Sequence, residues 1–413
     1  MSQLVQDLRF AVRSLRRRRA FALIAVATVA LGIGAATSIY TVVDGVLLRP
    51  LPYREAGRLV AIWQTYPSWK KQPILAAMWD RIPLSIPEYR DVRQLSGVFQ
   101  NVAIWSSSAA TITDVEAPEL VSTTRVSASL LDVLRERPLL GRMFLPSEDV
   151  PGGPRVALVS YESWQTRFAG DRHILGRTVR LDDVPYTVVG VLPRGLSIGR
   201  QEASLLGSSV FWIPVGQDSN DYRERTNHSY RAVARLAPAA SMERARVETR
   251  RLLCETTHSG LKGVRLDWFQ RDQVRDAKAP LLILLGAVAL LLGIACVNTA
   301  TLALGEAATR DQEMATRLAI GASRIVLVRQ LLTESLVLAV AGGTLGVVLA
   351  ALGTRTLIAL APPRIPGLAD VGMDLRVLAA AVVVAVTTGL LFGLAPALVS
   401  AGTGPASLLR AGA

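Results

Sequence analysis

The sequence predicts an α-helical membrane protein with four transmembrane helices and an α+β extracytoplasmic domain inserted between helices 1 and 2. Four stretches carry no charge and reach the roughly 20 apolar residues needed to cross a bilayer: Ala20–Val43, Leu281–Gly305, Ser335–Thr354 and Val377–Gly402. The region between the first two stretches, Arg49–Lys278, mixes strand and helix patterns. Charged residues make up 19% of the chain, below the roughly 25% that is usual for soluble domains.

Arginines flank the uncharged stretches and predict their orientation. The segment between the second and third stretches carries four of them: Arg310, Arg317, Arg324 and Arg329. A further run, Arg16–Arg19, precedes the first stretch. The positive-inside rule assigns such segments to the cytoplasm. Both termini are therefore expected in the cytoplasm, and the large polar region outside it.

These assignments divide the chain into nine segments. They are a cytoplasmic amphipathic helix at 1–19, transmembrane helices at 20–48, 280–305, 331–354 and 377–402, an extracytoplasmic domain at 49–279, a cytoplasmic segment at 306–330, an outer loop at 355–376, and a cytoplasmic tail at 403–413.

The first uncharged stretch is predicted to be an uncleaved anchor, because it is longer than the roughly 7–15 residues of a signal-peptide core. In the leader before it, Leu4, Leu8 and Val12 recur at helical spacing. This pattern predicts a short helix on the membrane surface, with its basic side toward anionic headgroups. An unstructured basic leader is the alternative.

Small residues and a proline mark features of the membrane helices. Gly32 and Gly34 either allow close helix packing or are ordinary membrane glycines. Pro280 is expected to begin the second transmembrane helix, because proline suits the first turn of a helix.

The extracytoplasmic region contains recognisable local elements. Ser85 and Glu88 have the spacing of a capping box at a helix start. Further patterns predict a strand at Val156–Ser160, a helix at Tyr161–Phe168, a hairpin of Thr178–Leu181 and Tyr186–Val191 around Asp182-Asp183, a strand at Tyr230–Leu236, and a helix from Ser241 to Glu255. A break near Gly152-Gly153-Pro154 is the expected seam if the domain has two subdomains.

Several function classes lack their sequence patterns. The four lysines, Lys70, Lys71, Lys262 and Lys278, lie outside any phosphate-binding G-x-x-x-x-G-K-[ST] pattern. The histidines His173, His228 and His258 are scattered, with no zinc-binding or triad spacing. We therefore expect no catalytic, cofactor-binding or metal-binding residues and no enzymatic activity in this chain. The formal charge of +13 favours a membrane surface over nucleic acid, since much of it flanks apolar stretches.

The tip between the second and third stretches is the candidate site. Glu306–Arg310 and Glu313–Arg317 form i,i+4 pairs in the stabilising order, and Met314 and Leu318 form an apolar pair. Gly321 is a natural helix stop, and Ser323 can cap the helix that follows Ala322. The tip is either a solvated connector or a docking surface for a cytosolic partner. The residues expected to make such a contact are Glu313, Met314, Arg317, Leu318, Gly321, Ala322 and Ser323.

Several segments of the chain carry a resemblance to known proteins. They are Glu313–Ser323 and Arg329–Ser335 in the tip and the third helix, Thr388–Leu398 in the last helix, and Val156–Ser160, Leu175–Val179, Tyr186–Pro193 and Tyr230–Leu236 in the outer domain. In their order and spacing these segments resemble the MacB/FtsX-type ABC permeases and their MacB-like periplasmic core domain. The stretches Asp7–Ala11 and Leu47–Tyr53 resemble one half of the duplicated orphan permeases, the ADOP branch.

The resemblance implies a permease subunit of the bacterial plasma membrane. An ABC ATPase subunit on a separate chain would dock at the tip, and ATP hydrolysis would move the outer domain for export or extraction of a substrate. A second permease copy or homologous half, membrane lipids and a periplasmic adaptor are the other expected partners, and nucleic acid is not one. The alternatives are a membrane-anchored sensor or scaffold without an ATPase, and a truncated half of a duplicated permease.

The topology can be tested with a single cysteine at Ile320, in a background without Cys254 and Cys296. A membrane-impermeant maleimide should label this position only after the membrane is opened, because the tip is expected in the cytoplasm. Labelling of intact cells at position 320 would contradict the topology.

Overall fold

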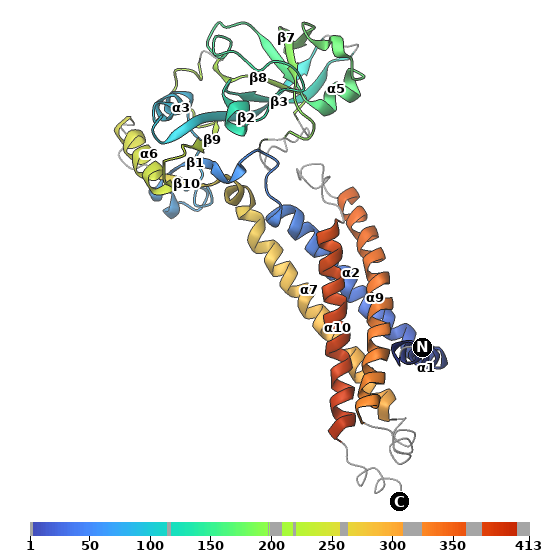
Figure 1. Ribbon diagram of the computed structural model, residues 1–413. Coiled ribbons are helices and arrows are strands. Elements are labelled where there is room, and N and C mark those ends of the chain that lie inside the picture. The colour runs from blue at the N-terminus through green and yellow to red at the C-terminus, as the bar shows by residue number, and fades with distance from the viewer. Residues whose placement is uncertain are drawn as a thin grey trace, which may run out of the picture. The chain divides into compact units, whose positions relative to one another are not determined.

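The computed structural model describes residues 3–113, 117–196, 198, 209–217, 220–256, 263–308, 324–360 and 374–402 (Figure 1). The chain forms two compact units. One consists of helices from Met1–Arg49 and from the part of the chain after Asp276, and the other is the α+β unit of Pro50–Arg275. Each unit is described by itself.

A single ten-stranded sheet forms the centre of the α+β unit. Its strands are β1 Leu59–Thr65, β2 Phe99–Ile112, β3 Glu119–Val126, β4 Leu140–Gly141, β5 Val156–Val159, β6 Thr178–Leu181, β7 Val184–Val191, β8 Phe211–Pro214, β9 Arg231–Leu236 and β10 Gly263–Trp268. The order is β10-β1-β9-β2-β3-β8-β5-β7-β4, and β6 pairs with β2 and β7. The pairs β3–β8 and β5–β7 are parallel, and the other pairs are antiparallel.

The expected seam at Gly152-Gly153-Pro154 is wrong. Strands β8, β5, β7, β4 and β6 all come from residues 140–214 and form one end of the sheet, whereas β10, β1, β9, β2 and β3 form the other. The chain therefore passes between the two ends before β4 and again after β8, and the β3–β8 pairing keeps the sheet continuous. The glycines and proline that suggested a boundary lie in the connection between β4 and β5, inside one end.

Both faces of the sheet are covered at the β1 end. Alternate side chains of β1 point to opposite faces: Ala61 and Trp63 join a core with helix α4 (Leu130–Leu134), and Val60 and Ile62 join a second core. Helices α3 (Ile86–Arg93) and α6 (Met242–Thr256) close the second core. Because both faces are buried, every residue of β1 is buried, which hides the alternation in the sequence.

Most of the predicted local elements are confirmed. The Ser85 N–H donates to a Glu88 carboxylate oxygen at 2.9 Å, and the Glu88 N–H donates to Ser85 Oγ at 3.4 Å, at the start of α3. Helix α5 (Tyr161–Arg167) follows β5. The β6–β7 hairpin turns through Asp182 and Asp183 at φ of 49° and 62°. Aspartate tolerates this left-handed conformation, which matches the twist of a two-residue hairpin.

One arginine is buried inside the α+β unit. The Arg235 side chain on β9 is 1% exposed and donates to three backbone carbonyls. These are Val133 at 2.8 Å, Glu55 at 3.0 Å and Arg54 at 2.9 Å. A buried guanidinium needs such partners, because desolvation of an unpaired charge is costly. Burial lowers the pKa of Arg235 from its usual value.

The helical unit contains α1 (Gln3–Arg17), α2 (Arg19–Val43) with a π-helical extension Asp44–Leu48, α9 (Arg324–Leu360) and α10 (Leu375–Gly402), together with the part of α7 (Phe269–Ala308) that begins at Asp276. Among the described residues, three helical stretches are long and apolar enough to cross a membrane: Arg19–Leu48, Phe269–Glu306 and Leu332–Thr356. A shorter apolar stretch, Leu375–Leu391, lies in α10.

The expected helix start at Pro280 is wrong. Helix α7 begins at Phe269, directly after β10, and Pro280 lies inside it. Several residues before the proline are good helix formers, among them Gln, Arg, Ala and Lys, so the helix continues through Pro280 although its ring removes one backbone donor and crowds the preceding turn. Helix α9 likewise extends beyond the predicted 331–354 at both ends, so the helices are longer than the apolar stretches that predicted them.

A charge-assisted pair fixes the connection between β4 and β5. Arg142 donates from both terminal nitrogens to the Glu148 carboxylate, at 2.8 and 2.7 Å, and the Leu145 N–H donates to the same group at 2.8 Å. The Glu148 side chain is 5% exposed. The Arg142 hydrogen bonds outweigh burial and lower the pKa of Glu148.

Glu148→Gln should destabilise the α+β unit by about 1–3 kcal/mol at neutral pH, because it replaces a buried charge-assisted pair. A lowered pKa contributes stability above the ordinary glutamate value of about 4.3, and this is lost as pH falls through the folded value. The difference from the parent should therefore shrink in acid. Thermal unfolding of the detergent-solubilised chain, followed by tryptophan fluorescence, measures the stability difference between variant and parent at neutral pH and in acid.

Glu243→Gln is the matched control, since Glu243 pairs with Arg246 but is 70% exposed. It should change little at either pH. If the Glu148→Gln variant and the parent lost equal stability between neutral pH and acid, the charged Glu148 carboxylate would not be stabilising the unit.

Candidate functional site

The predicted contact residues of the tip lie outside the described residues. They are Glu313, Met314, Arg317, Leu318, Gly321, Ala322 and Ser323. The structure describes the helices on either side, α7 as far as Ala308 and α9 from Arg324. The candidate site is therefore built from the helices that hold the tip.

Helices α2 and α9 approach so closely that a Cβ at the contact would require the neighbouring backbone to shift by a few tenths of an ångström. A Cβ built on Gly34 would lie 3.1 Å from the carbonyl oxygen of Gly346, and one on Gly346 would lie 3.0 Å from the carbonyl oxygen of Ala30. Each neighbour is backbone, which cannot move aside as a side chain could. Gly34 therefore has the packing role that the sequence left open, as is common for small residues between membrane helices.

Gly32 faces a different helix. A Cβ there would lie 2.9 Å from Leu292 on α7. Because Leu292 contributes a flexible side-chain end, this contact is less restrictive than the backbone contact at Gly34. The two glycines thus place α2 against α7 and α9, respectively.

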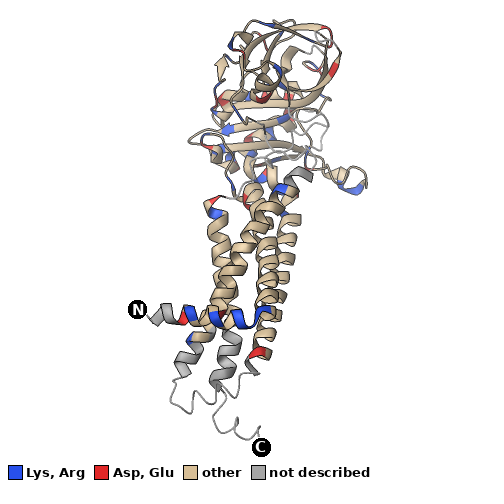
Figure 2. Ribbon diagram, turned by 90° about the vertical axis from the view of Figure 1, so that its right-hand side faces the viewer, with Lys and Arg blue, Asp and Glu red and all other residues tan. Residues whose placement is uncertain are grey.

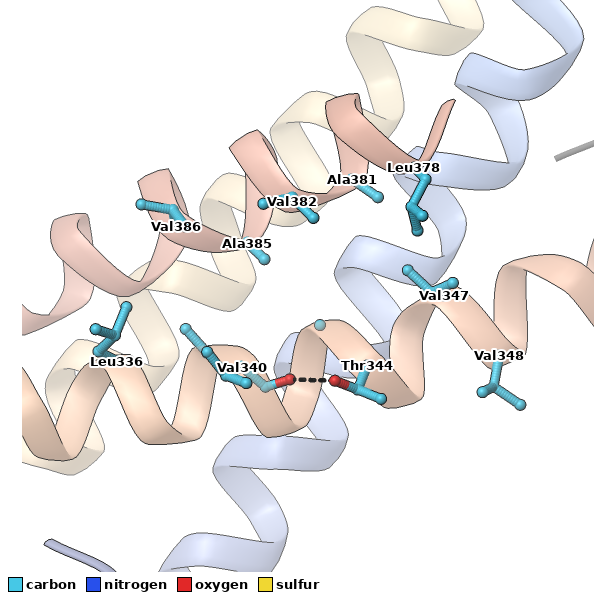
Figure 3. A pocket seen from close by; sticks show the side chains of 12 residues that line it. Leu336, Val340, Thr344, Val347, Val348, Leu378, Ala381, Val382, Ala385 and Val386 are labelled. Carbon is cyan, nitrogen blue, oxygen red and sulfur yellow. Dashed lines mark hydrogen bonds between the residues drawn. The ribbon is translucent and has the colours of Figure 1, made fainter. Parts of the chain in front are cut away.

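Helix α10 packs on α9 through small residues as well. A Cβ on Gly343 would lie 2.9 Å from Cβ of Ala385, and one on Gly389 would lie 2.6 Å from Cβ of Ala339. Between the same helices lies a cavity of about 300 Å³ (Figure 3). It is lined on α9 by Leu336, Val340 and Thr344, and on α10 by Leu378, Val382 and Val386, among others.

This cavity offers almost no polar chemistry. The Thr344 hydroxyl donates to the Val340 carbonyl oxygen of its own helix at 2.8 Å, the dashed line in Figure 3. The side chains that line the cavity are otherwise apolar. An apolar groove of this kind suits lipid or another helix, and it provides no path for a charged solute.

Two ion pairs join α1 and the bend that follows it to the helices on either side of the tip. Arg18, at the bend between α1 and α2, pairs with the Glu306 carboxylate of α7. Arg329 of α9 lies 2.8 Å from the carboxylate of Asp7 on α1, and the Asp7 side chain is 8% exposed. Figure 2 shows the basic and acidic residues of α1 where this helix crosses the bundle. Helix α1 and the bend after it are thereby tied to α7 at Glu306 and to α9 at Arg329.

A third set of charges lies at the other end of α2. Arg49 donates to the Asp374 carboxylate at 2.6 Å and lies 3.5 Å from that of Asp44. Asp374 also accepts the backbone N–H groups of Arg376 and Val377, each at 3.0 Å, and so caps α10. The Val377 N–H and the Arg49 hydrogen bond lower the pKa of Asp374.

The pairing of these charges could not be predicted from the sequence. Arg18 and Glu306 are separated by 288 positions, and Asp7 and Arg329 by 322. The sequence shows charges beside apolar stretches, but nothing in it specifies which charge meets which. Within the described residues no group of three or more His, Cys, Asp and Glu side chains could hold a metal ion, and neither Cys254 nor Cys296 is in a disulfide.

Comparison with known proteins identifies the two units. Residues 22–252 match the MacB-like periplasmic core domain, and residues 283–405 match the FtsX-like permease C-terminal domain. The chain belongs to the MacB/FtsX family of ABC transporter permeases. It is a membrane protein with an extracytoplasmic domain, and as a member of this family it is a permease subunit.

Relatives with curated names are longer than this chain. The pyoverdine export ATP-binding/permease protein PvdT of Pseudomonas syringae pv. tomato is 27% identical over 278 residues, which cover 66% of this chain and 40% of PvdT. The macrolide export ATP-binding/permease protein MacB of Azoarcus sp. is 24% identical over 417 residues, which cover 96% of this chain and 58% of that MacB. The MacB/FtsX chain therefore spans less than two thirds of either relative.

Two solved structures show a weak similarity to this chain. The periplasmic region of MacB from Actinobacillus actinomycetemcomitans has 15% identity and a TM-score of 0.39, covering 57% of this chain and 95% of that one. The extracellular domain of the transporter YknZ from Gram-positive bacteria has 17% identity and a TM-score of 0.37, covering 50% and 99%, respectively.

Gly34→Val should separate α2 from α9 and destabilise the bundle by about 1–3 kcal/mol, the usual cost of overpacking. Gly286→Val is the matched control, because Gly286 lies in the uncharged part of α7 and a Cβ there meets nothing within 4 Å. The unfolding temperature of each detergent-solubilised variant measures the effect. Equal temperatures for the two variants would contradict close packing at Gly34.

Proposed function

We propose that this permease couples ATP hydrolysis, by an ATPase subunit on a separate chain, to motion of its extracytoplasmic domain for export or extraction of a substrate. The proposal includes four transmembrane helices in the plasma membrane, both termini in the cytoplasm, and no catalytic residues in this chain. The names of the relatives support it, because they join an ATP-binding part to an export permease. They specify pyoverdine and macrolides for those proteins and so favour export as the direction.

The observation that carries the proposal is that the helices on both sides of the tip, α7 and α9, form ion pairs with α1 and the bend after it. Glu306 and Arg329 stand at the two sides of residues 309–323 and pair with Arg18 and Asp7. A displacement of the tip by a docked ATPase would therefore move α7, α9 and α1 together. Helix α7 begins at the residue after strand β10, so one continuous helix runs from the edge strand to the tip.

A second copy or a homologous half completes the proposed machine. ABC transporters act through two ATPase subunits face to face, so two permease subunits are expected, related by two-fold symmetry if identical. The sequence resemblance to the duplicated branch would place both halves in one chain in related proteins. A periplasmic adaptor is a further proposed partner of the extracytoplasmic domain.

Met314→Asp with Leu318→Asp should abolish ATPase association while leaving membrane insertion unchanged, because the apolar pair is the proposed anchor. Gly321→Val should weaken association too, since a branched residue in a left-handed conformation costs about 1–2 kcal/mol. The measurement is affinity purification of the tagged permease from native membranes, with the co-purified ATPase quantified by mass spectrometry.

Thr316→Asp with Ala319→Asp is the control, because these positions fall on the other side of the predicted helix and add the same charge. Recovery of the ATPase should be normal for this control. Equal recovery with all variants, at equal permease levels, would exclude docking at the tip. A purified complex with one permease per two ATPases would contradict the proposed pairing, and absence of any ATPase would favour a sensor or scaffold.

A further inference from the structure

The segment between β1 and α3 displays exposed apolar side chains at its tip. Ile74 is 89% exposed, the largest fraction for any large apolar side chain among the described residues, and Met78 is 53% exposed. Exposure of this degree in the α+β unit is unexpected, because most of its large apolar side chains are buried in cores. We refer to residues 66–79 as the 66–79 segment.

The 66–79 segment is an ordered structure closed at its base. The Tyr66 N–H donates to the Trp79 carbonyl oxygen at 2.7 Å, and the Tyr66 ring stacks on Trp69 with centroids 5.0 Å apart. Lys70 places its ammonium 3.8 Å from the centroid of the Trp79 ring. Consecutive turns lead through Gln72 to the exposed apolar tip.

Its composition is that of a membrane interface. Between positions 67 and 79 the segment carries two tryptophans and two lysines, Lys70 and Lys71, and no acidic residue. Tryptophan rings prefer the level of the lipid headgroups, because one edge is polar and the rest apolar. Lysines beside them attract anionic headgroups while their apolar stems cover the hydrophobic boundary.

The base of the segment is attached to the helix that leads into the membrane. Asp80, the next residue, accepts Arg275 of α7 at 2.6 Å, and Arg265 of β10 lies 3.8 Å from the same oxygen. Lys278 is the last charged residue of α7 before its uncharged stretch. Arg275 precedes Pro280 by only five positions in the sequence of the same helix.

We propose that the 66–79 segment is a lipid anchor, which inserts Ile74 and Met78 into the outer leaflet of the membrane and places its tryptophans and lysines among anionic phospholipid headgroups. A protein partner fits this surface less well. Stable protein interfaces bury at least about 1,200 Å² in total, and two exposed apolar side chains provide much less. The proposal is independent of ATPase docking, because it concerns only the extracytoplasmic domain and the lipid.

The test places an environment-sensitive fluorophore beside the exposed side chains of Ile74 and Met78. A cysteine replaces Ala77, which is exposed, in a full-length chain without Cys254 and Cys296, reconstituted in nanodiscs of phosphatidylcholine and phosphatidylglycerol. Doxyl-labelled lipid should quench this fluorophore several-fold more strongly than one at His173→Cys, whose parent side chain is 97% exposed. Aqueous iodide should show the opposite preference.

Further variants separate the contributions. Ile74→Asp with Met78→Asp should remove quenching by lipid at position 77, and Lys70→Gln with Lys71→Gln should remove its dependence on phosphatidylglycerol. ATPase recovery should be unchanged in both variants, which distinguishes failure of this proposal from failure of the proposed function. Equal iodide quenching at positions 77 and 173 would overturn the lipid anchor. Protection from iodide without quenching by lipid would also overturn it, and would indicate a protein partner instead.

Discussion

The contact of α2 with α9 at Gly34 and Gly346 is the constraint on which the helical unit depends. Between membrane helices there is no hydrophobic driving force, so association relies on close packing of backbones. Helix α9 makes such contacts on two sides, with α2 through these glycines and with α10 through Gly343. Helix α9 therefore links α2 to α10. Helix α1 continues from α2 through the bend at Arg18, and α7 packs on α2 at Gly32.

Ion pairs add to the close packing of the helices, and they lie at the ends of the helices rather than along their middle. Arg18 with Glu306 and Arg329 with Asp7 join α1 to the helices of the tip, and Arg49 with Asp374 joins α2 to α10. The middle of the described bundle carries small apolar residues instead. This distribution follows from the bilayer, in which a charge is costly at the centre and inexpensive near the headgroups.

Local rules predicted much of this structure. The capping box of Ser85 depends on neighbours three positions away, and the Asp182-Asp183 turn depends on two residues, so both could be recognised in sequence. The helix starting at Phe269 was missed because Pro280 resembles a helix start when only its neighbours are considered. Residues 140–214 were not recognised as one end of the sheet, because strand order depends on pairings between distant segments. The Arg18–Glu306 and Asp7–Arg329 pairs are equally nonlocal, and the exposed tip around Ile74 is visible only once the rest of the domain is folded.

Arg235 bonds to backbone atoms, and this affects how substitutions around it act on the fold. Its three hydrogen-bond acceptors are main-chain carbonyls at positions 54, 55 and 133, and every amino acid supplies a carbonyl. A substitution at one of those positions therefore leaves the acceptor itself in place, although the Glu55 carboxylate, 4.0 Å from Arg235, and the buried Val133 side chain have contacts of their own. The arginine itself cannot be substituted in this way, because a lysine has a single nitrogen and cannot reproduce a planar fork that reaches three acceptors. Loss of the Arg235 side chain would thus remove all three hydrogen bonds at once, whereas a substitution at an acceptor position removes none of the three acceptor atoms.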